Sequence, residues 1–169
     1  MTSSCLKVEG TGNIAFSRAD VVRAGGGNDT IISGYGSDQI FGDAGNDTLT
    51  GGQDRDFLTG GTGTDTFNLG VTTDSAVGAV TADQILDFST ADGDKIRLAD
   101  IDADTSSATT NEAFSFIGSA AFSGIAGELR AETLSGVTHV YGDVNADGAA
   151  DFEIVLNNGV TLSATDFIL

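Results

Sequence analysis

The stretch AGGGNDTII-SGYGSDQIF-GDAGNDTLT-GGQDRDFLT-GGTGTDTFN, residues 24–68, decides the fold, because nine-residue units follow one another in it without an insertion. The sixth position of every unit is an aspartate, and these are Asp29, Asp38, Asp47, Asp56 and Asp65. The eighth position is a large apolar residue, and these are Ile31, Ile40, Leu49, Leu58 and Phe67. A weaker unit precedes them, with Asp20 and Val22 in the matching places.

Each unit joins a glycine-rich half to a short apolar half. Glycines at the first, second and fourth positions are expected to provide positive φ angles, which other residues resist. Asp43 and Asp54 replace two of these glycines, and aspartate tolerates the left-handed conformation better than most residues do. The last three residues of a unit favour β structure. One unit cannot bury its apolar side chain alone, so the units are expected to stack around a continuous interior ladder.

The pattern resembles the G-G-x-G-x-D-x-U-x nonapeptide of RTX proteins. This resemblance implies an all-β fold, a right-handed parallel β-roll in which two units form one coil. Units 18 residues apart then lie above one another, and adjacent strands are about 4.8 Å apart. Asp29, Asp47 and Asp65 are expected to stack along one edge of the roll. Asp38 and Asp56 stack along the other edge, with Asp20 beneath Asp38.

Stacked carboxylates at this spacing repel one another by several kcal/mol at an effective dielectric constant of about 20. Calcium resolves the conflict, because it takes 6–8 oxygen ligands and accepts backbone carbonyls beside carboxylates. In the proteins that this chain resembles, carbonyls of the lower loop and of the upper loop complete each site. The first site implied here comprises Gly25, Gly27, Asp29, Gly42, Ala44 and Asp47. The second comprises Gly34, Gly36, Asp38, Gly51, Gln53 and Asp56. The third comprises Asp43, Gly45, Asp47, Gly60, Thr62 and Asp65.

The net charge agrees with a need for bound cations, since 25 acidic residues oppose 7 basic ones and give −18. A chain this acidic is not expected to bind nucleic acid, which requires a basic patch. No apolar run approaches the roughly 20 residues that span a bilayer, so no membrane insertion is expected. Cys5 is the only cysteine, which excludes a disulfide framework. The N-terminus lacks the pattern of a Sec signal peptide, so secretion would use another route.

The nonapeptide fades after Phe67, but Asp74 lies 18 residues beyond Asp56 and is a candidate to cap that edge. Residues 80–98, VTADQILDFSTADGDKIRL, resemble the C-terminal domain of serralysin-type secreted metalloproteases. In that family the segment closes the roll and holds a further calcium ion, which implies Asp94 and Asp87 as ligands. Arg97 stands where the family commonly has an aspartate. The resemblance continues at AFSFIG (113–118), AFSGIAGELR (121–130), GDVNADGAADFEI (142–154) and TDFIL (165–169).

Val140-Tyr141 and residues 152–156 alternate like paired strands around an oxygen-rich turn. The oxygen-bearing residues of this turn are Asp143, Asn145, Asp147 and Asp151. Their spacing is similar to the first half of an EF-hand loop, although position twelve falls on Ile154 in place of glutamate. Calcium binding and a tight hairpin stabilised by Asx turns both stay open.

The ending Asp166-Phe167-Ile168-Leu169 resembles the uncleaved signal of type I (ABC-transporter) secretion, and it also suits a packed terminal strand. Ser163 is expected to cap the preceding turn. No catalytic residue is predicted: His139 is the only histidine, so an HExxH zinc site is absent, and no GxSxG motif occurs.

The sequence therefore predicts three regions: residues 1–19 of unclear role, a roll over 20–79, and a β-sandwich-like cap with a secretion signal over 80–169. The predicted function is a non-catalytic, extracellular module that folds when calcium binds and supports type I secretion. The predicted partners of this module are calcium, the export machinery and an N-terminal catalytic domain of a longer protein. The alternative is a polysaccharide-binding accessory module, because the R-modules of alginate epimerases resemble this layout.

Overall fold

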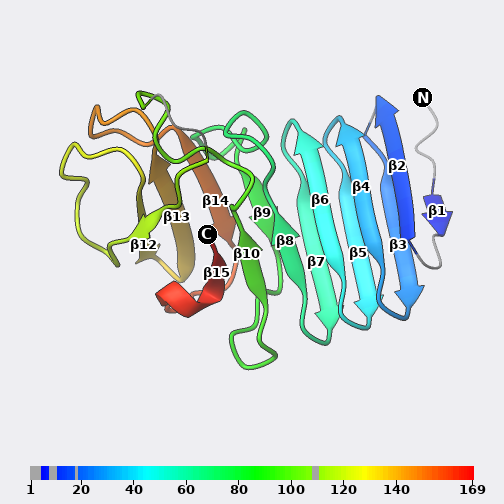
Figure 1. Ribbon diagram of the computed structural model, residues 1–169. Coiled ribbons are helices and arrows are strands. Elements are labelled where there is room, and N and C mark those ends of the chain that lie inside the picture. Colours follow the sequence, from blue (N-terminus) through cyan, green and yellow to red (C-terminus); the bar gives the residue numbers. More distant parts are fainter. Residues whose placement is uncertain (1–4, 8–10, 18, 108–110) are drawn as a thin grey trace.

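The computed structural model describes residues 5–7, 11–17, 19–107 and 111–169, and it consists of two sheets that lie face to face. The larger sheet has the order β1 (Cys5–Lys7), β3 (Val21–Gly26), β5 (Gln39–Ala44), β7 (Phe57–Thr62), β9 (Asp83–Ile85), β14 (Phe152–Leu156), β13 (Val137–Asp143), β12 (Glu128–Leu134) and β11 (Ser115–Phe116). The smaller sheet has the order β15 (Phe167–Ile168), β10 (Lys95–Arg97), β8 (Thr66–Asn68), β6 (Thr48–Gln53), β4 (Thr30–Tyr35) and β2 (Thr11–Ser17). Figure 1 shows the stacked strands running side by side from the N-terminal end to the C-terminal region.

The eighteen-residue period sets the register of both sheets. Thr30 of β4 pairs with Thr48 of β6, and Gln39 of β5 pairs with Phe57 of β7, in each case with parallel strands. From β1 to β10 consecutive strands alternate between the two sheets, so two nine-residue units complete one coil of the roll. The predicted all-β roll is therefore confirmed, together with a C-terminal region that contains antiparallel pairs.

The strands of the roll are longer than the three residues per unit that the sequence predicted. Each of β3 to β7 has six residues and continues into the first three positions of the next unit. Gly34 pairs with Gly52 and Tyr35 with Gln53, so the glycine-rich positions also belong to the ladder. Strand pairing extends through the glycine-rich positions because their backbone N–H and C=O groups lie opposite those of the unit 18 residues away. Only the fourth to sixth positions are left as the turn.

The interior of the roll is a ladder of the eighth-position side chains. Ile31, Ile40 and Leu49 are fully buried, and their neighbours at the seventh and ninth positions face outward. Alternating burial of this kind is what places one residue of each strand in the core. The same core continues into the C-terminal region through Phe88 and Phe152.

The C-terminal region extends both sheets of the roll. β9 pairs with β7 on one side and with β14 on the other, and β14, β13 and β12 are antiparallel neighbours. In the smaller sheet β10 follows β8, and the terminal strand β15 pairs with β10. A single 3₁₀ turn, η1 (Ala164–Asp166), precedes β15, and the N–H of Ser163 donates to the Asp166 carboxylate at 2.7 Å, which is the reciprocal bond of a capping box. Within the described part of the chain, no helix has the length and apolarity to cross a membrane.

Replacing one rung of the interior ladder tests this packing. Leu49→Ala is expected to lower the free energy of unfolding by about 2–5 kcal/mol, because it leaves a cavity between closely stacked coils. Chemical denaturation in millimolar calcium measures the change. Val80→Ala serves as the control, since Val80 is 80% exposed and its truncation is expected to have little effect. Equal losses for the two variants would contradict the assigned core.

Candidate metal centre between the stacked loops

The repeat aspartates form two ladders in which every rung is a backbone-to-carboxylate hydrogen bond. The N–H of Asp29 donates to Oδ1 of Asp47 at 2.7 Å, and the N–H of Asp47 donates to Oδ1 of Asp65 at 2.8 Å. On the other edge the N–H groups of Asp20 and Asp38 donate to Asp38 and Asp56, both at 2.7 Å. The structure therefore stacks the aspartates as the eighteen-residue spacing predicts. These bonds fix the orientation of each carboxylate.

In four of these carboxylates the second oxygen is buried and has no hydrogen-bond partner. This holds for Oδ2 of Asp38, Asp47, Asp56 and Asp65, four residues that are at most 1% exposed. Buried polar atoms in folded proteins almost always have a partner, so each of these oxygens requires an explanation. A cation between the loops supplies one, since a buried charge is stable when it is paired or coordinates a metal.

The glycine-rich positions serve two different purposes. At the second and fourth positions of all five units φ is positive, and Asp43 and Asp54, with φ of 72° and 77°, adopt the left-handed backbone as predicted. The prediction of positive φ at the first position is wrong, because Gly42, Gly51 and Gly60 do not have it. What these three glycines provide is space beside the aspartate of their own unit.

Gly42 is packed closely against two oxygens that suit a cation. A Cβ placed on Gly42 would lie 2.4 Å from Oδ2 of Asp47 and 2.5 Å from the carbonyl oxygen of Gly60 in the next coil, so a side chain there would clash with both. One carboxylate oxygen and one carbonyl oxygen from neighbouring coils therefore lie on the same side of the Gly42 backbone. Calcium accepts both kinds of oxygen, so the residues present fit a calcium ion.

Other backbone carbonyls line the same gaps. A Cβ placed on Gly45 or Gly63 would meet the carbonyl oxygen of Gly27 or Gly45 at 2.0 and 2.1 Å, so fourth-position carbonyls face the coil above. Third-position carbonyls bind across the gap instead: Ala44, Gln53 and Thr62 accept hydrogen bonds from Gly27, Gly36 and Gly45, respectively. A carbonyl oxygen has a second lone pair, so this bond does not by itself exclude a metal contact.

One residue of the ladder, Asp83, was not predicted as a ligand from the sequence. The N–H of Asp56 donates to Oδ1 of Asp83 at 2.8 Å, so Asp83 follows Asp56 on this edge, although they lie 27 residues apart. The signal was present in the sequence, since Asp83 precedes Ile85 with the same Asp-x-apolar spacing as in the repeats. Asp94 closes the other ladder in the same way and accepts from the N–H of Asp65 at 2.9 Å.

Two further predicted ligands lie near the ladders but have their own partners. Asp74 accepts hydrogen bonds at Oδ2 from the N–H groups of Gly70 and Val71, within its own turn. It does not take the place above Asp56, because the segment after the repeats bulges before it returns with Asp83. Asp87 accepts from the N–H groups of Gly60 and Gly61, both at 2.9 Å, and so covers the last glycine-rich loop.

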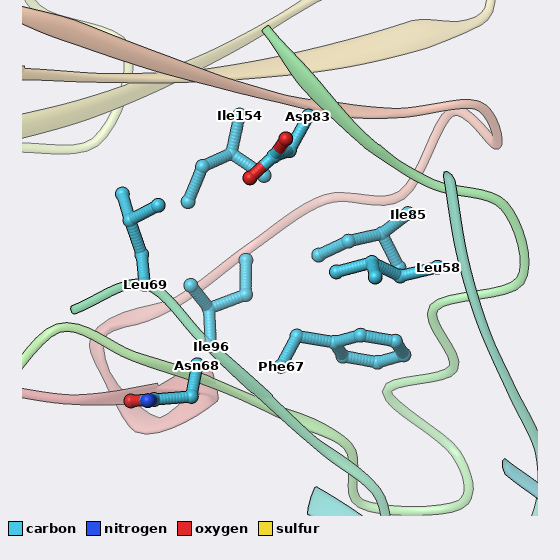
Figure 2. A pocket seen from close by; sticks show the side chains of 8 residues that line it. All are labelled: Leu58, Phe67, Asn68, Leu69, Asp83, Ile85, Ile96 and Ile154. Carbon is cyan, nitrogen blue, oxygen red and sulfur yellow. The ribbon is translucent and has the colours of Figure 1, made fainter. Parts of the chain in front are cut away.

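Burial raises the pKa of the carboxylates at the junction between the roll and the C-terminal region. The pKa of Asp56 is raised to about 8, and that of Asp83 to about 9, primarily because burial disfavours the charged form. Figure 2 shows Asp83 near Ile154 at a small cavity that is lined mostly by apolar side chains, which accounts for this desolvation. The pKa values of Asp38, Asp47, Asp65 and Asp94 are raised for the same primary reason.

The turn between β13 and β14 is held by its own hydrogen bonds. Asp143 is fully buried and accepts from the N–H groups of Asn145, Ala146 and Gly148. Asp151 accepts from the N–H of Val144 and from the side-chain amide of Asn145, both at 2.7 Å. The carboxylate of Asp147 accepts from the N–H of Ala149. This geometry favours the Asx-turn hairpin over a calcium loop; calcium binding there stays an untested prediction.

Within the described part of the chain, side chains alone do not form a metal site. Among the described residues, no three histidine, cysteine, aspartate or glutamate side chains converge on a common point that could hold an ion. A cation in these gaps therefore depends on backbone carbonyls together with the aspartates. Calcium suits such a donor set, because it binds carbonyl and carboxylate oxygens in irregular geometry.

The raised pKa values predict how the metal-free protein responds to pH. A buried carboxylate whose pKa is higher in the folded than in the unfolded chain stabilises the fold below pH 4, and this contribution is lost as the pH rises toward 9. In EGTA the folded fraction, measured by far-UV circular dichroism, is therefore expected to decrease as the pH rises toward 9. Asp83→Asn is expected to flatten this dependence. A folded fraction that increases with pH would contradict the assignment.

Comparison with known proteins agrees with this geometry. The sequence profile of the RTX calcium-binding nonapeptide repeat matches residues 14–49 and 41–75. No curated protein matches the chain. Among solved structures, the AlgE6R3 subunit of the mannuronan C5-epimerase from Azotobacter vinelandii is similar, with a TM-score of 0.66 and 31% identity over 95% of this chain and 83% of that one. The AlgE6R2 subunit of the same enzyme is also similar, with a TM-score of 0.63 and 26% identity over 95% and 92% of the two chains.

These similarities refine the family assignment that the sequence suggested. The similar structures reported above are subunits of an epimerase, so the specific resemblance to serralysin-type domains is not supported by them. The repeat profile, the aspartate ladders and the shared fold agree with one another. The chain belongs to the family of RTX calcium-binding nonapeptide-repeat modules.

Proposed function

We propose that this chain is a non-catalytic module of a secreted protein, and that calcium bound between its stacked loops drives its folding. The observation that carries the proposal is the set of buried Oδ2 atoms, on Asp38, Asp47, Asp56 and Asp65, that have no hydrogen-bond partner. The other oxygen of each of these carboxylates, Oδ1, accepts a backbone N–H and thereby fixes the carboxylate in place. The Oδ2 atoms, which carry the negative charge that no hydrogen bond stabilises, face the gaps between the coils.

The proposed ligands are the repeat aspartates and the carbonyls of the loops above and below them. The gap between residues 42–47 and 60–65 has the strongest support, because Oδ2 of Asp47 and the carbonyl oxygen of Gly60 both lie close to the same side of the Gly42 backbone. Asp83 and Asp94 take part at the ends of the two ladders by continuing their hydrogen-bonding pattern. Asp74 and Asp87 are assigned supporting roles, since backbone amides occupy their oxygens.

Calcium concentration would then control when the module folds. Extracellular calcium-binding modules have dissociation constants of about 10⁻⁴–10⁻³ M, far above the free calcium of a cell interior. Each site contributes about 2.7 kcal/mol when calcium is at 100 times its dissociation constant. Several such sites are enough to decide whether a domain of this size is folded.

Type I export is the proposed reason for this control. A metal-free chain with a net charge of −18 would stay unfolded and pass through a narrow channel. After folding, the end of the chain packs away: Phe167 is buried, Leu169 packs against the core, and β15 pairs with β10. The same terminal residues would therefore be available to the exporter only before calcium binds.

Metal removal tests the proposal. In EGTA the β-type far-UV circular dichroism signal is expected to be lost, and millimolar calcium is expected to restore it, whereas magnesium is a poor substitute because it resists a large, irregular oxygen cage. Asp47→Asn is expected to raise the calcium concentration at the folding midpoint by about tenfold. Asp92→Asn removes the same charge from an exposed position and is expected to leave the midpoint nearly unchanged. A metal-free chain that keeps a cooperative thermal transition at neutral pH would contradict the proposal.

The similarity to the epimerase subunits favours a second role, which is binding of an acidic polysaccharide such as mannuronan. Two arginines lie over aromatic rings on the outer face of β3, β5 and β7. The guanidinium of Arg23 is 3.9 Å from the centre of the Phe41 ring, and that of Arg55 is 4.6 Å from the centre of the Phe57 ring. Each pair offers a cation beside an apolar surface, which suits the carboxylate and the ring face of a uronate sugar.

The charge of the chain sets a condition on this role. Arg23 also lies 3.4 Å from Asp43, and the net charge of −18 repels a polyanion. Bound calcium would lower that repulsion by neutralising the aspartates beneath this face. Polysaccharide binding is therefore proposed for the calcium-loaded module.

Binding of mannuronate oligomers in millimolar calcium tests the second role. The double variant Arg23→Ala/Arg55→Ala is expected to bind at least about tenfold more weakly, because it loses two charge-assisted contacts. Arg97→Ala is the matched control, since Arg97 lies on β10 of the other sheet and contacts Asp100 and Asn68. Titration calorimetry measures the affinity of the wild type, the double variant and Arg97→Ala for mannuronate oligomers. A neutral glucan is the control ligand for all three proteins. Equal affinity of the double variant and the wild type would contradict the role of this face.

A further inference from the structure

One of the described arginines, Arg55, differs from the others in its surroundings. Arg23, Arg97 and Arg130 each form an ion pair with an aspartate or a glutamate. Arg55 forms no ion pair with any residue that the structure describes, and its buried Nε atom has no hydrogen-bond partner. This is unexpected in a chain with 25 acidic and 7 basic residues. Buried polar atoms almost always have a partner, so the Nε donor of Arg55 requires an explanation.

A cavity of about 200 Å³ lies beside Arg55. Ser37 and Arg55 line it from two turns of the roll, and Thr73 and Thr81 line it from the segment between β8 and β9. The guanidinium group thus shares one cavity with three side chains that carry hydroxyl groups. Pockets for drug-sized molecules begin at about 300 Å³, so this cavity suits a single small ring.

The segment that closes the cavity is held against the C-terminal region by hydrogen bonds. The N–H of Gly78 donates to Oε2 of Glu153 at 2.8 Å, and Oε1 of Glu153 lies 2.7 Å from Nδ1 of His139. The N–H of Glu153 donates to the carbonyl oxygen of Ser75 at 3.1 Å. The wall of the cavity is therefore ordered by contacts within the protein, and a ligand that enters does not lose affinity by ordering it.

The charges around the cavity limit the kind of anion that it can hold. Asp54 and Asp74 also line it, so a doubly charged oxyanion is repelled about twice as strongly as a carboxylate. The planar guanidinium of Arg55 matches a carboxylate through two parallel hydrogen bonds. Serine and threonine hydroxyls both donate and accept, which suits the hydroxyl groups of a sugar. The cavity therefore favours a singly charged sugar acid.

We propose that this cavity binds one uronate residue, with the carboxylate on the Arg55 guanidinium and the sugar hydroxyls on Ser37, Thr73 and Thr81. The inference rests on the polysaccharide-binding role proposed above, and it identifies the carboxylate as the group that selects the ligand. The Phe57 ring, whose centre is 4.6 Å from the guanidinium, supports Arg55 from the other side of the contact.

Calcium is expected to control this cavity. Ser37 directly precedes Asp38, and Arg55 directly precedes Asp56. The Oδ2 atoms of these two aspartates are among the cation ligands proposed above. A bound cation would fix both turns and lower the negative potential around Arg55. Binding of the uronate is therefore expected in millimolar calcium and is expected to be lost in EGTA.

Titration of the isotopically labelled full chain with single sugars, followed by amide NMR in millimolar calcium, tests the inference. Mannuronate is expected to shift the amide signals of Ser37, Arg55 and Thr73. Mannose has a hydroxymethyl group in place of the carboxylate and is expected to bind at least about tenfold more weakly. Arg55→Gln is expected to weaken mannuronate binding by at least about tenfold, whereas Arg97→Gln, on the other sheet, is the matched control and is expected to have little effect. Circular dichroism confirms that each variant is folded.

The comparison of the two sugars requires no variant, so the test stands even if Arg55→Gln does not fold. Equal affinity for mannuronate and mannose would overturn the inference, as would equal affinity of Arg55→Gln and the wild type for mannuronate. Inorganic sulfate that binds as tightly as mannuronate would show a general anion site and would overturn it as well. A wild type that binds mannuronate oligomers but not the single sugar would overturn the inference alone. Failure to bind the oligomers would refute the polysaccharide-binding role itself.

Discussion

The structure depends on how one aspartate per unit divides its two oxygens between neighbouring coils. One oxygen accepts the backbone N–H of the aspartate in the coil before it, as between Asp47 and Asp65 at 2.8 Å. This bond aligns the coils, and in Asp38, Asp47, Asp56 and Asp65 the second oxygen is then held inside the gap without a hydrogen-bond partner. The bond that orders the roll thereby also concentrates negative charge within it. A stable fold requires something to bind that charge.

The rest of the architecture follows from this requirement. Positive φ at the second and fourth positions turns the chain sharply enough for the loops to stack, and the first-position glycines keep space next to the carboxylates. The apolar ladder from Ile31 to Phe67 forms the interior between the two edges. At the end of the repeats Asp83 and Asp94 continue the ladders while the surrounding backbone changes, so the C-terminal region joins the roll without a break in either sheet. The functional chemistry and the fold are built from the same residues.

Much of this was predictable because the repeat has a strict period. The position of each repeat aspartate, the inward side chains and the left-handed backbone of Asp43 and Asp54 all follow from a fixed phase along the chain. The prediction was weaker where the phase is lost. Asp74 has the correct spacing from Asp56, yet Asp83 takes that place, because the length of a bulge between strands cannot be obtained from a period. The purpose of the first-position glycines depends on distances across the gap, which a sequence does not contain.

The central claim is that a cation lies between stacked aspartates, and anomalous scattering from a crystal grown in calcium tests it most directly. The account predicts an anomalous peak between the loops 42–47 and 60–65, at about 2.3–2.6 Å from Oδ2 of Asp47 and from the carbonyl oxygen of Gly60. Ordered loops with no peak at that position, in crystals that contain millimolar calcium, would contradict it.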